Sequence, residues 1–396
     1  MIHLAWQDRA FAAARQGDLR CEVQQGRNGK TEIPAQDTQE EEPTMSMFKN
    51  LITTAAIIGA LTLSAQGALA QNKLELNMAT PWAGGHWLDI GAKKYAENVE
   101  RMTEGRIKIN VFPAGALGPA LKVTETVQKG VADMGHSWPG YDWAIDRTGA
   151  IFSGWSAGPN PEEMMMWLYN GGGADLWKQW RKEKFDVVAF PCGVLETEFF
   201  MHSHKPIRTA DDMKGLKLRT SSSWAEIAPM LGASTVVLPG SEVFSALERK
   251  VVDAIEWGGP GSNLSEGFHK VAKYVIMPGL HAPSGAHDCV FNNATWAKIG
   301  DKDKALLEMA GRLTVLDTYL GYAKSDLDAY KQIKASNIEV IQVDPGLTAA
   351  VVKASGEWAE KQAAANPWFK KAYDSQKAFM ASVKPMAEFR FATGTR

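Results

Sequence analysis

Cysteine is scarce in this sequence, with three residues in 396. Cys21 lies near the N-terminus, which leaves Cys192 and Cys289 in the body of the chain. Two cysteines form at most one bridge, so a small disulfide-framed domain is excluded. They either pair in an oxidising compartment or remain two separate buried thiols. The sequence also lacks a phosphate-binding loop, a metalloprotease motif and a redox cysteine pair, which removes common enzyme signatures.

Neither sign of charge is in excess. The chain carries 43 Lys and Arg against 45 Asp and Glu, and six and eight of these lie within residues 1–70, which leaves 37 of each. Because nucleic-acid-binding proteins present clustered basic residues, this balance argues against a nucleic-acid partner. With 45% hydrophobic and 22% charged residues, the composition is that of a globular protein of about two domains.

Long hydrophobic runs are also missing. The apolar run from Leu51 to Leu63 is interrupted by Thr53, Thr54 and Gly59 and is too short for a membrane span of about 20 residues. It follows a basic start at Met47 and precedes Ala68-Leu69-Ala70, the arrangement of a secretory signal peptide. A buried core helix is the alternative. We predict a signal peptide at 47–70, an upstream leader at 1–46 that is absent from the mature protein, and a periplasmic location.

Two segments with the same pattern suggest two α/β lobes. Residues 73–78 and 106–112 alternate polar and apolar side chains as strands do, with a helical pattern between them. A helical stretch then leads into Val131-Ala132-Asp133, and a second one leads into Val251-Val252-Asp253. Ligands of open α/β sheets bind beyond the carboxyl ends of strands. The following residues, His136 to Trp138 and Glu256 with Trp257, are therefore expected to face each other across a cleft.

The remainder of the chain is mainly helical. Residues 301–336 predict one long helix, 340–343 a short strand, and 349–391 a helix broken near Pro367. Since no low-complexity linker is present, we expect the lobes to be joined by several chain crossings. The predicted lobe I comprises 71–195 and 281–330, and lobe II comprises 196–280 and 331–396.

One enzyme-like motif is present. Gly154-Trp155-Ser156-Ala157-Gly158 matches the nucleophile elbow, but that turn requires a helix directly after the serine. Here the helix is predicted to begin later, with Asn160 as N-cap, Pro161 at the first position and Glu163 at the third. The Gly171–Gly173 run follows helical residues and is interpreted as a helix C-terminal turn. We therefore predict that the protein is not an enzyme.

Arg219 is the main candidate for ligand binding. It ends a predicted strand just before Ser221-Ser222-Ser223, and a guanidinium at a strand tip suits two-pronged capture of a carboxylate. A surface salt bridge is the alternative. Four tryptophans near the predicted strand tips offer flat rings to a small ligand: Trp138, Trp143, Trp224 and Trp257.

Several motifs, in this order, resemble a known family. They are 112–115 (Phe-Pro-Ala-Gly), 131–136 (Val-Ala-Asp-Met-Gly-His), 167–173 (Trp-Leu-Tyr-Asn-Gly-Gly-Gly), 213–219 (Met-Lys-Gly-Leu-Lys-Leu-Arg), 252–257 (Val-Asp-Ala-Ile-Glu-Trp) and 270–274 (Lys-Val-Ala-Lys-Tyr). Together they are similar to the solute-binding proteins of tripartite ATP-independent periplasmic (TRAP) transporters, in particular to the branch that binds 2-oxo acids and hydroxy monocarboxylates. The likeness spans residues 72–380.

The resemblance implies a bilobed α/β fold with a long spanning helix and a small carboxylate between the lobes. It implies that Arg219 binds the carboxylate, with Glu198, His136, Trp138 and Trp257 as further ligand contacts. It also implies Na⁺ or Ca²⁺ in the site, held by Glu256, the Trp257 backbone and Glu198, and no organic cofactor. The expected partners are the small and large membrane subunits, and a homodimer is a further expectation. A zwitterionic ligand or a ligand-sensing role in a signalling receptor is the alternative function.

Two positions depart from that branch of the family. Glu198 stands where the branch has glutamine, and Ala282 stands where it has a second acidic metal ligand, after Pro278-Gly279-Leu280-His281. Two carboxylates in a poorly hydrated cleft require a neutralising partner. Three are considered: a bound cation, a direct pair between Glu198 and Arg219, or a positively charged ligand.

Overall fold

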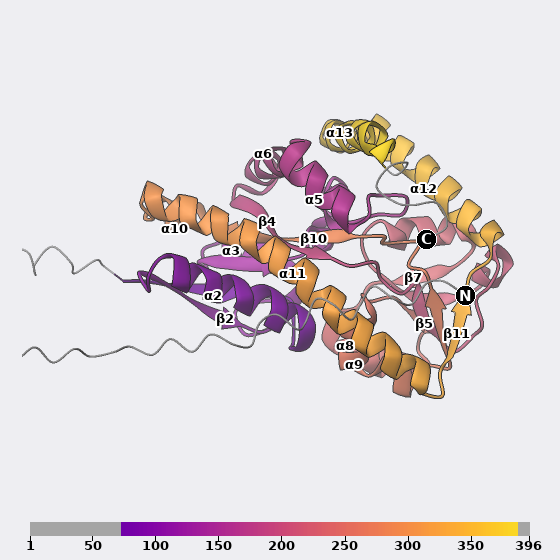
Figure 1. The fold of residues 1–396 in the computed structure, drawn as a ribbon. Helices are drawn as coiled ribbons and strands as arrows, with labels where there is room; N and C mark the ends of the chain where they lie inside the picture. The colour runs from indigo at the N-terminus through magenta and orange to yellow at the C-terminus, as the bar shows by residue number, and fades with distance from the viewer. Residues whose placement is uncertain (1–72, 387–396) are drawn as a thin grey trace, which may run out of the picture. The chain divides into compact units, whose positions relative to one another are not determined.

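The computed structural model describes residues 73–386 (Figure 1). The predicted leader and signal peptide, and residues 387–396, lie outside this range. The described chain contains two β-sheets, and we define each lobe by its sheet and the helices packed on that sheet. This is the predicted bilobed α/β class.

The sheet of lobe I has five strands in the order β2-β1-β3-β10-β4. β1, β2 and β3 are parallel, whereas β10 is antiparallel to both β3 and β4. The alternating segments found in the sequence form the first two strands. The strands are β1 (Leu74–Ala79), β2 (Ile107–Phe112), β3 (Met134–Ser137), β4 (Val188–Leu195) and β10 (Gly285–Phe291).

Helices cover both faces of this sheet. One face packs against α2 and α11, and the other against α3, α4, α5 and α6 (Figure 1). The helices of lobe I are α2 (Lys93–Met102), α3 (Val123–Gln128), α4 (Gly149–Ser153), α5 (Pro161–Asn170), α6 (Gly173–Phe185) and the short α10 (Asn293–Ala297). α5 begins with the predicted capping box between Asn160 and Glu163 and ends before Gly171, so no helix follows Ser156 directly and the nucleophile elbow is absent.

The sheet of lobe II has six strands in the order β11-β9-β5-β8-β6-β7. Its strands are β5 (Met201–Ser203), β6 (Lys217–Arg219), β7 (Ser234–Val236), β8 (Ala254–Ile255), β9 (Tyr274–Met277) and β11 (Glu339–Gln342). Its helices are α7 (Trp224–Ile227), α8 (Gly240–Glu248) and α9 (Pro260–Glu266).

The two segments with the same pattern, 131–133 and 251–253, also have the same local structure. In each segment the aspartate carboxylate accepts a hydrogen bond from a backbone N–H of the neighbouring strand. Asn77 N donates to Asp133 Oδ2 at 2.9 Å, and Lys217 N donates to Asp253 Oδ2 at 3.0 Å. Each aspartate thereby joins the start of one strand to its neighbour. The helices end earlier than the sequence suggested, because Val251 and its counterpart Val131 lie in turns with exposed side chains.

Three crossings join the lobes near the cleft: residues 196–200, residues 278–284, and the helix α11 (Asp301–Ala335). α11 has 35 residues, is about 50 Å long at about 1.5 Å per residue, and contacts β4 and α2 in lobe I and α9 in lobe II. This is the predicted spanning helix.

The C-terminal helices correct the predicted domain boundaries. α12 (Pro345–Ala365) packs against α7 in lobe II, but α13 (Pro367–Val383) packs against α4, α5 and α6 in lobe I. The segment 331–396 was assigned wholly to lobe II. After the break at Pro367 the chain lies in lobe I, where Gln376 accepts a hydrogen bond from the Trp155 indole at 2.9 Å.

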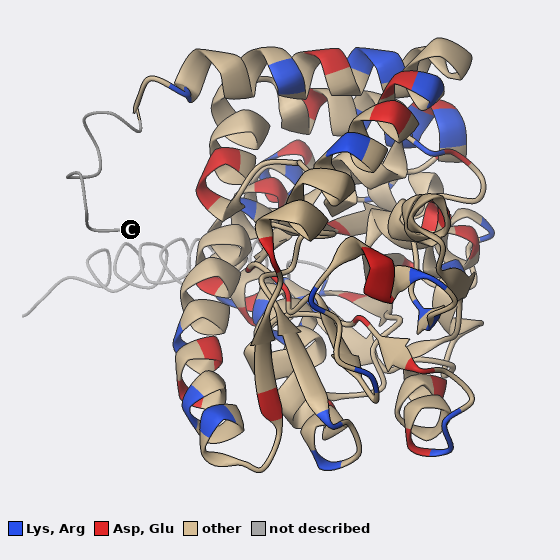
Figure 2. Ribbon diagram, turned by 90° about the vertical axis from the view of Figure 1, so that its right-hand side faces the viewer, with Lys and Arg blue, Asp and Glu red and all other residues tan. Residues whose placement is uncertain are grey.

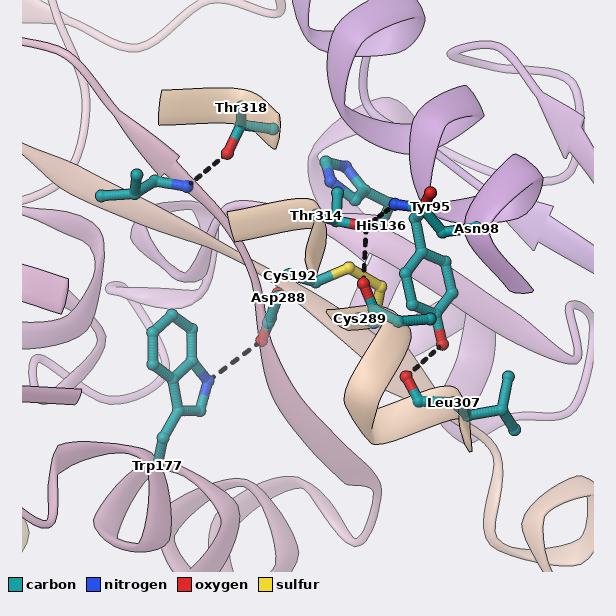
Figure 3. Close-up of a disulfide and its surroundings, with 12 residues drawn as sticks. Tyr95, Asn98, His136, Trp177, Cys192, Asp288, Cys289, Leu307, Thr314 and Thr318 are labelled. Atoms are coloured by element: carbon teal, nitrogen blue, oxygen red, sulfur yellow. Dashed lines mark hydrogen bonds between the residues drawn. A yellow bond between two sulfur atoms is a disulfide. The ribbon is translucent and has the colours of Figure 1, made fainter. Parts of the chain in front are cut away.

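A disulfide and a group of buried ion pairs stabilise lobe I. Cys192 on β4 and Cys289 on β10 form a disulfide, so they are not two separate thiols (Figure 3). On the other face, the fully buried Arg181 of α6 binds Asp142 at 2.6 Å and Asp288 of β10 at 2.8 Å. On the surface, acidic and basic residues alternate along the helices (Figure 2), as expected of a chain with balanced charge.

Candidate ligand and cation site

A cavity lies between the lobes at the carboxyl ends of their strands. It contains about 480 Å³ of empty space, its open mouth included. Lobe I supplies aromatic walls: Trp82, Trp87, Trp138 and Tyr141. Lobe II supplies Arg219, the three serines 221–223, Trp224, Glu256 and Trp257, and the crossing segments supply Glu198, His281 and Ala282.

Arg219 is the last residue of β6, and its guanidinium is 2% exposed. Its Nη2 donates to the Leu238 carbonyl at 2.9 Å, and its Nη1 donates to the Glu256 carbonyl at 2.9 Å and to the Glu256 carboxylate at 3.4 Å. The Trp257 ring lies against the guanidinium, 5.2 Å from its carbon to the ring centroid. These contacts fix the direction of the arginine before any ligand arrives.

His281 joins the two acidic residues of the site. Its Nε2 lies 3.0 Å from Glu198 Oε2 and 3.5 Å from Glu256 Oε2. The crossing segments bring them together by close backbone contact, since a Cβ on Gly279 would lie 2.2 Å from the Glu198 carbonyl oxygen. Ser156 supports the arrangement by donating to the His281 carbonyl at 3.4 Å.

The charges of this triad depend on one another. Burial raises the pKa of Glu198 to about 7, against the opposing effect of the His281 hydrogen bond. Burial would also lower the pKa of His281, but hydrogen bonds to Glu198 and Glu256 outweigh it and raise that pKa to about 9. Burial would raise the pKa of Glu256, yet His281 and Arg219 together lower it. An imidazolium at His281 therefore offsets part of the charge of the two carboxylates, and Arg219 offsets the rest at Glu256.

The direct pair between Glu198 and Arg219, one of the three alternatives considered, is not formed. Arg219 contacts Glu256 instead, and His281 holds Glu198. His281 is the functional residue that sequence reasoning missed. The signal for it is the Pro278–His281 motif, in which His281 directly precedes Ala282, a cavity residue whose side chain offers no ligand atom.

The triad also fits a metal ion. One ligand atom from each of Glu198, Glu256 and His281 lies within 4.8 Å of the others. Carboxylate oxygens suit Na⁺ and Ca²⁺, whereas an imidazole ligates a metal only when neutral. A cation at this place would therefore replace the His281 proton as the neutralising charge.

Most of the other predicted residues line the cavity. Trp138 and Trp257 do so, and the Trp138 indole is anchored by the Ser153 carbonyl at 2.8 Å. His136 lies behind the wall, where its Nδ1 accepts the Trp82 indole N–H at 3.1 Å. Burial lowers the pKa of His136 to about 3, so it is neutral and positions Trp82.

Three further aromatic residues depart from the sequence reading. Trp143 does not line the cavity, because it packs under Arg147, 5.1 Å from the guanidinium carbon to the ring centroid. Trp82 and Trp87 line the cavity, although most tryptophans of the chain were expected to pack in the core or on helices. Trp87 contacts Trp257 of the other lobe, with ring centroids 4.9 Å apart.

The family model of bacterial extracellular solute-binding protein family 7 matches residues 78–366. The chain belongs to this family. It is 30% identical over 349 residues to the monocarboxylate 2-oxoacid-binding periplasmic protein of Nostoc sp.. The alignment covers 85% of this chain and 94% of the Nostoc protein. The chain is 26% identical over 277 residues to the sialic acid-binding periplasmic protein of Vibrio cholerae, covering 64% of this chain and 78% of that one.

Solved structures of family 7 proteins show the same fold. A TRAP periplasmic solute-binding protein from Pseudoalteromonas atlantica with bound sodium and pyruvate has a TM-score of 0.76 at 27% identity, over 80% of this chain and 97% of that one. The protein from Colwellia psychrerythraea with bound calcium and pyruvate has the same TM-score and coverage at 26% identity. These proteins are transporter receptors, so the chain is a solute-binding protein of the TRAP type and not an enzyme.

Proposed function

We propose that this chain is the periplasmic subunit of a TRAP transporter that binds a small 2-oxo or hydroxy monocarboxylate together with Na⁺ or Ca²⁺. The observation that carries the proposal is a set of polar groups converging on one cavity. Arg219, the Ser222 hydroxyl and the Trp224 indole all line it. The Ser222 Oγ and the Trp224 Nε1 are buried and have no hydrogen-bond partner among residues 73–386.

A ligand carboxylate satisfies these donors. Buried polar groups are almost always hydrogen-bonded, so unpaired donors on a cavity wall indicate that a ligand or water completes them. A carboxylate accepts from Ser222 and Trp224 and benefits from the positive charge of Arg219. The aromatic wall of lobe I then covers the short carbon chain and excludes water.

The cation has a defined place in this arrangement. Glu198 and Glu256 would hold it, with His281 neutral, and the bound cation would present a positive charge to the 2-oxo or hydroxy oxygen. The Pseudoalteromonas protein binds pyruvate with sodium and the Colwellia protein binds pyruvate with calcium, which supports this choice.

Calorimetry tests the proposal with pyruvate and lactate, each in chelator, in added Na⁺ and in added Ca²⁺. We expect micromolar or tighter binding in at least one of the cation conditions and weaker binding in chelator. The matched variant Ser222→Ala should bind more weakly by about 1–3 kcal/mol, because the carboxylate loses a hydrogen bond. Tight binding of neither acid in any condition would contradict the assignment of the substrate class.

The predicted signal peptide supports periplasmic delivery to membrane subunits. No helix within residues 73–386 is long and apolar enough to cross a membrane. Mass spectrometry of protein recovered from the periplasm should show a chain that begins near Gln71. A species that retains Met1 would contradict processing at this site.

The homodimer stays a prediction, and α11 suggests where it forms. Met309, Leu316, Leu320 and Leu327 are about half exposed or more, and their spacing of seven, four and seven residues is that of a coiled-coil seam. A second copy of the same helix fits such a seam. Sedimentation should show a dimer that Leu320→Lys dissociates, with Val352→Lys on α12 as a control. A monomeric wild-type protein would exclude this interface.

A further inference from the structure

A second cavity adjoins the ligand cavity where the lobes meet. It contains about 260 Å³ of empty space, its mouth included. Trp87, Leu195 and Glu198 line both cavities, so the two spaces adjoin at these side chains. Its remaining wall comes from lobe I, from lobe II and from the spanning helix α11. A ligand that extends beyond the first cavity therefore has a space to enter.

Several residues that line this second space carry polar atoms without a partner in residues 73–386. Tyr322 of α11 lines it, is 3% exposed, and its hydroxyl bonds to nothing within the described chain. The His86 Nε2 and the Glu196 Oε1 are also buried without a partner in residues 73–386. These groups include both donors and acceptors, so the cavity is suited to a group that both donates and accepts a hydrogen bond.

Asp326, one turn along α11 from Tyr322, also lines the cavity. Its Oδ1 accepts the backbone N–H of Gly261 at 2.6 Å, which fixes the carboxylate against the start of α9. Glycines leave room for this contact, since a Cβ on Gly259 would lie 2.6 Å from Asp326 Oδ2 and one on Gly261 would lie 2.6 Å from His86 Nε2. The Tyr322 ring stacks on His86 with centroids 5.8 Å apart. The polar groups are thus held in place by packing.

We propose that the second cavity is a subsite for a hydroxyl group at the far end of the ligand. The inference rests on the proposed function, because the ligand carboxylate must first be held in the main cavity. A hydroxyl donates to Glu196 or Asp326 and accepts from Tyr322, whereas a methyl end leaves these groups unpaired. The preferred ligand is therefore a chain-terminal hydroxylated 2-oxo acid. A site built to bond a hydroxyl discriminates strongly against the analogue that lacks it.

Calorimetry with matched ligand pairs tests the subsite. The pairs are 2-oxo acids of four, five and six carbons, each with and without a terminal hydroxyl, measured with the cation that supports pyruvate binding. We expect wild-type protein to prefer the hydroxylated acid by about tenfold or more at one chain length. Tyr322→Phe keeps the ring and its stacking on His86, and it should reduce that preference to below about threefold while pyruvate affinity stays unchanged.

Tyr319→Phe is the control, because this tyrosine is on the same helix but does not line the cavity. An equal loss of preference in Tyr319→Phe would overturn the assignment to Tyr322. The absence of any hydroxyl preference at all three lengths would also overturn it, and the cavity would then hold water alone. Pyruvate binding distinguishes the subsite proposal from the proposed function. If pyruvate binds and no hydroxylated acid binds more tightly, the subsite proposal is wrong and the proposed function stands. If neither pyruvate nor any other acid in the series binds, both are wrong.

Discussion

The His281 imidazolium makes a testable contribution to the stability of the ligand-free protein. It contacts Glu198 and Glu256 in a site where its exposure is 4%. His281→Gln retains a polar side chain of similar reach but removes the positive charge. The two carboxylates then face each other with Arg219 as the remaining neutralising group on the cavity wall, so the variant should be less stable at neutral pH.

The magnitude follows from the difference between the folded and unfolded pKa of the imidazole. The folded pKa is about 9, and the ordinary value is 6.5. At about 1.4 kcal/mol per pH unit, the His281 proton stabilises the fold by about 3 kcal/mol. Because the folded pKa is raised, this contribution is complete below pH 6.5 and is lost as the pH rises through 9. The raised pKa of Glu198 acts in the same direction between pH 4.5 and 7.

Urea unfolding in chelator, without ligand, measures this effect at pH 6.5, 8 and 9.5. We expect the unfolding free energy of wild-type protein to fall by about 2–3 kcal/mol across this range. That of His281→Gln should fall by less, because the imidazolium contribution is absent and only the raised pKa of Glu198 still acts in this direction. His269→Gln, at a half-exposed histidine away from the cavity, should keep the wild-type slope. A flat wild-type profile, or an unchanged slope in His281→Gln, would refute the assignment of charge to His281.

Three further predictions concern Arg181, the disulfide and Arg219. Arg181→Met leaves two carboxylates unpaired in the core of lobe I and should lower the unfolding free energy by about 3–5 kcal/mol, measured by urea unfolding. The disulfide Cys192–Cys289 closes a loop across 97 positions, so its reduction should lower the unfolding free energy by up to about 4–5 kcal/mol. The unfolding midpoint in urea should therefore be lower in reductant. An equal midpoint with and without reductant would mean that the bridge is absent in solution. Arg219→Lys cannot reproduce the paired contact with the Leu238 carbonyl and should weaken pyruvate binding by about 2–5 kcal/mol in calorimetry, whereas near wild-type affinity would place this residue outside the ligand contacts.

The sequence was sufficient for the features that depend on local pattern. The alternation of polar and apolar residues predicted β1 and β2, and an uninterrupted helical pattern predicted α11. The repeated segment that ends in Asp133 and Asp253 predicted two similar lobes. The strand tips also located Arg219 and Glu256, because the end of a strand can be recognised from the residues that follow it. These predictions needed no knowledge of which distant segments meet.

The features that depend on tertiary contact were missed or misplaced. His281 meets Glu198 only because residues 196–200 and 278–284 cross between the lobes side by side, and no local pattern encodes that contact. His136 ends a strand as predicted, yet the Trp82 ring covers it and takes its place on the cavity wall. The return of α13 to lobe I was likewise set by packing against α5 and α6 rather than by the break at Pro367 itself.

The unequal character of the two walls has a consequence for the order of events in binding. Arg219, Ser222 and Glu256 all belong to lobe II, whereas the facing wall in lobe I is aromatic. A lobe II separated from its partner would still present its charged and hydrogen-bonding groups, so capture can precede closure. The encounter step should then be slowed by salt, since it is electrostatic, whereas the covering step buries apolar rings and should be nearly indifferent to salt. Two kinetic phases with different salt dependence would be the signature of this division.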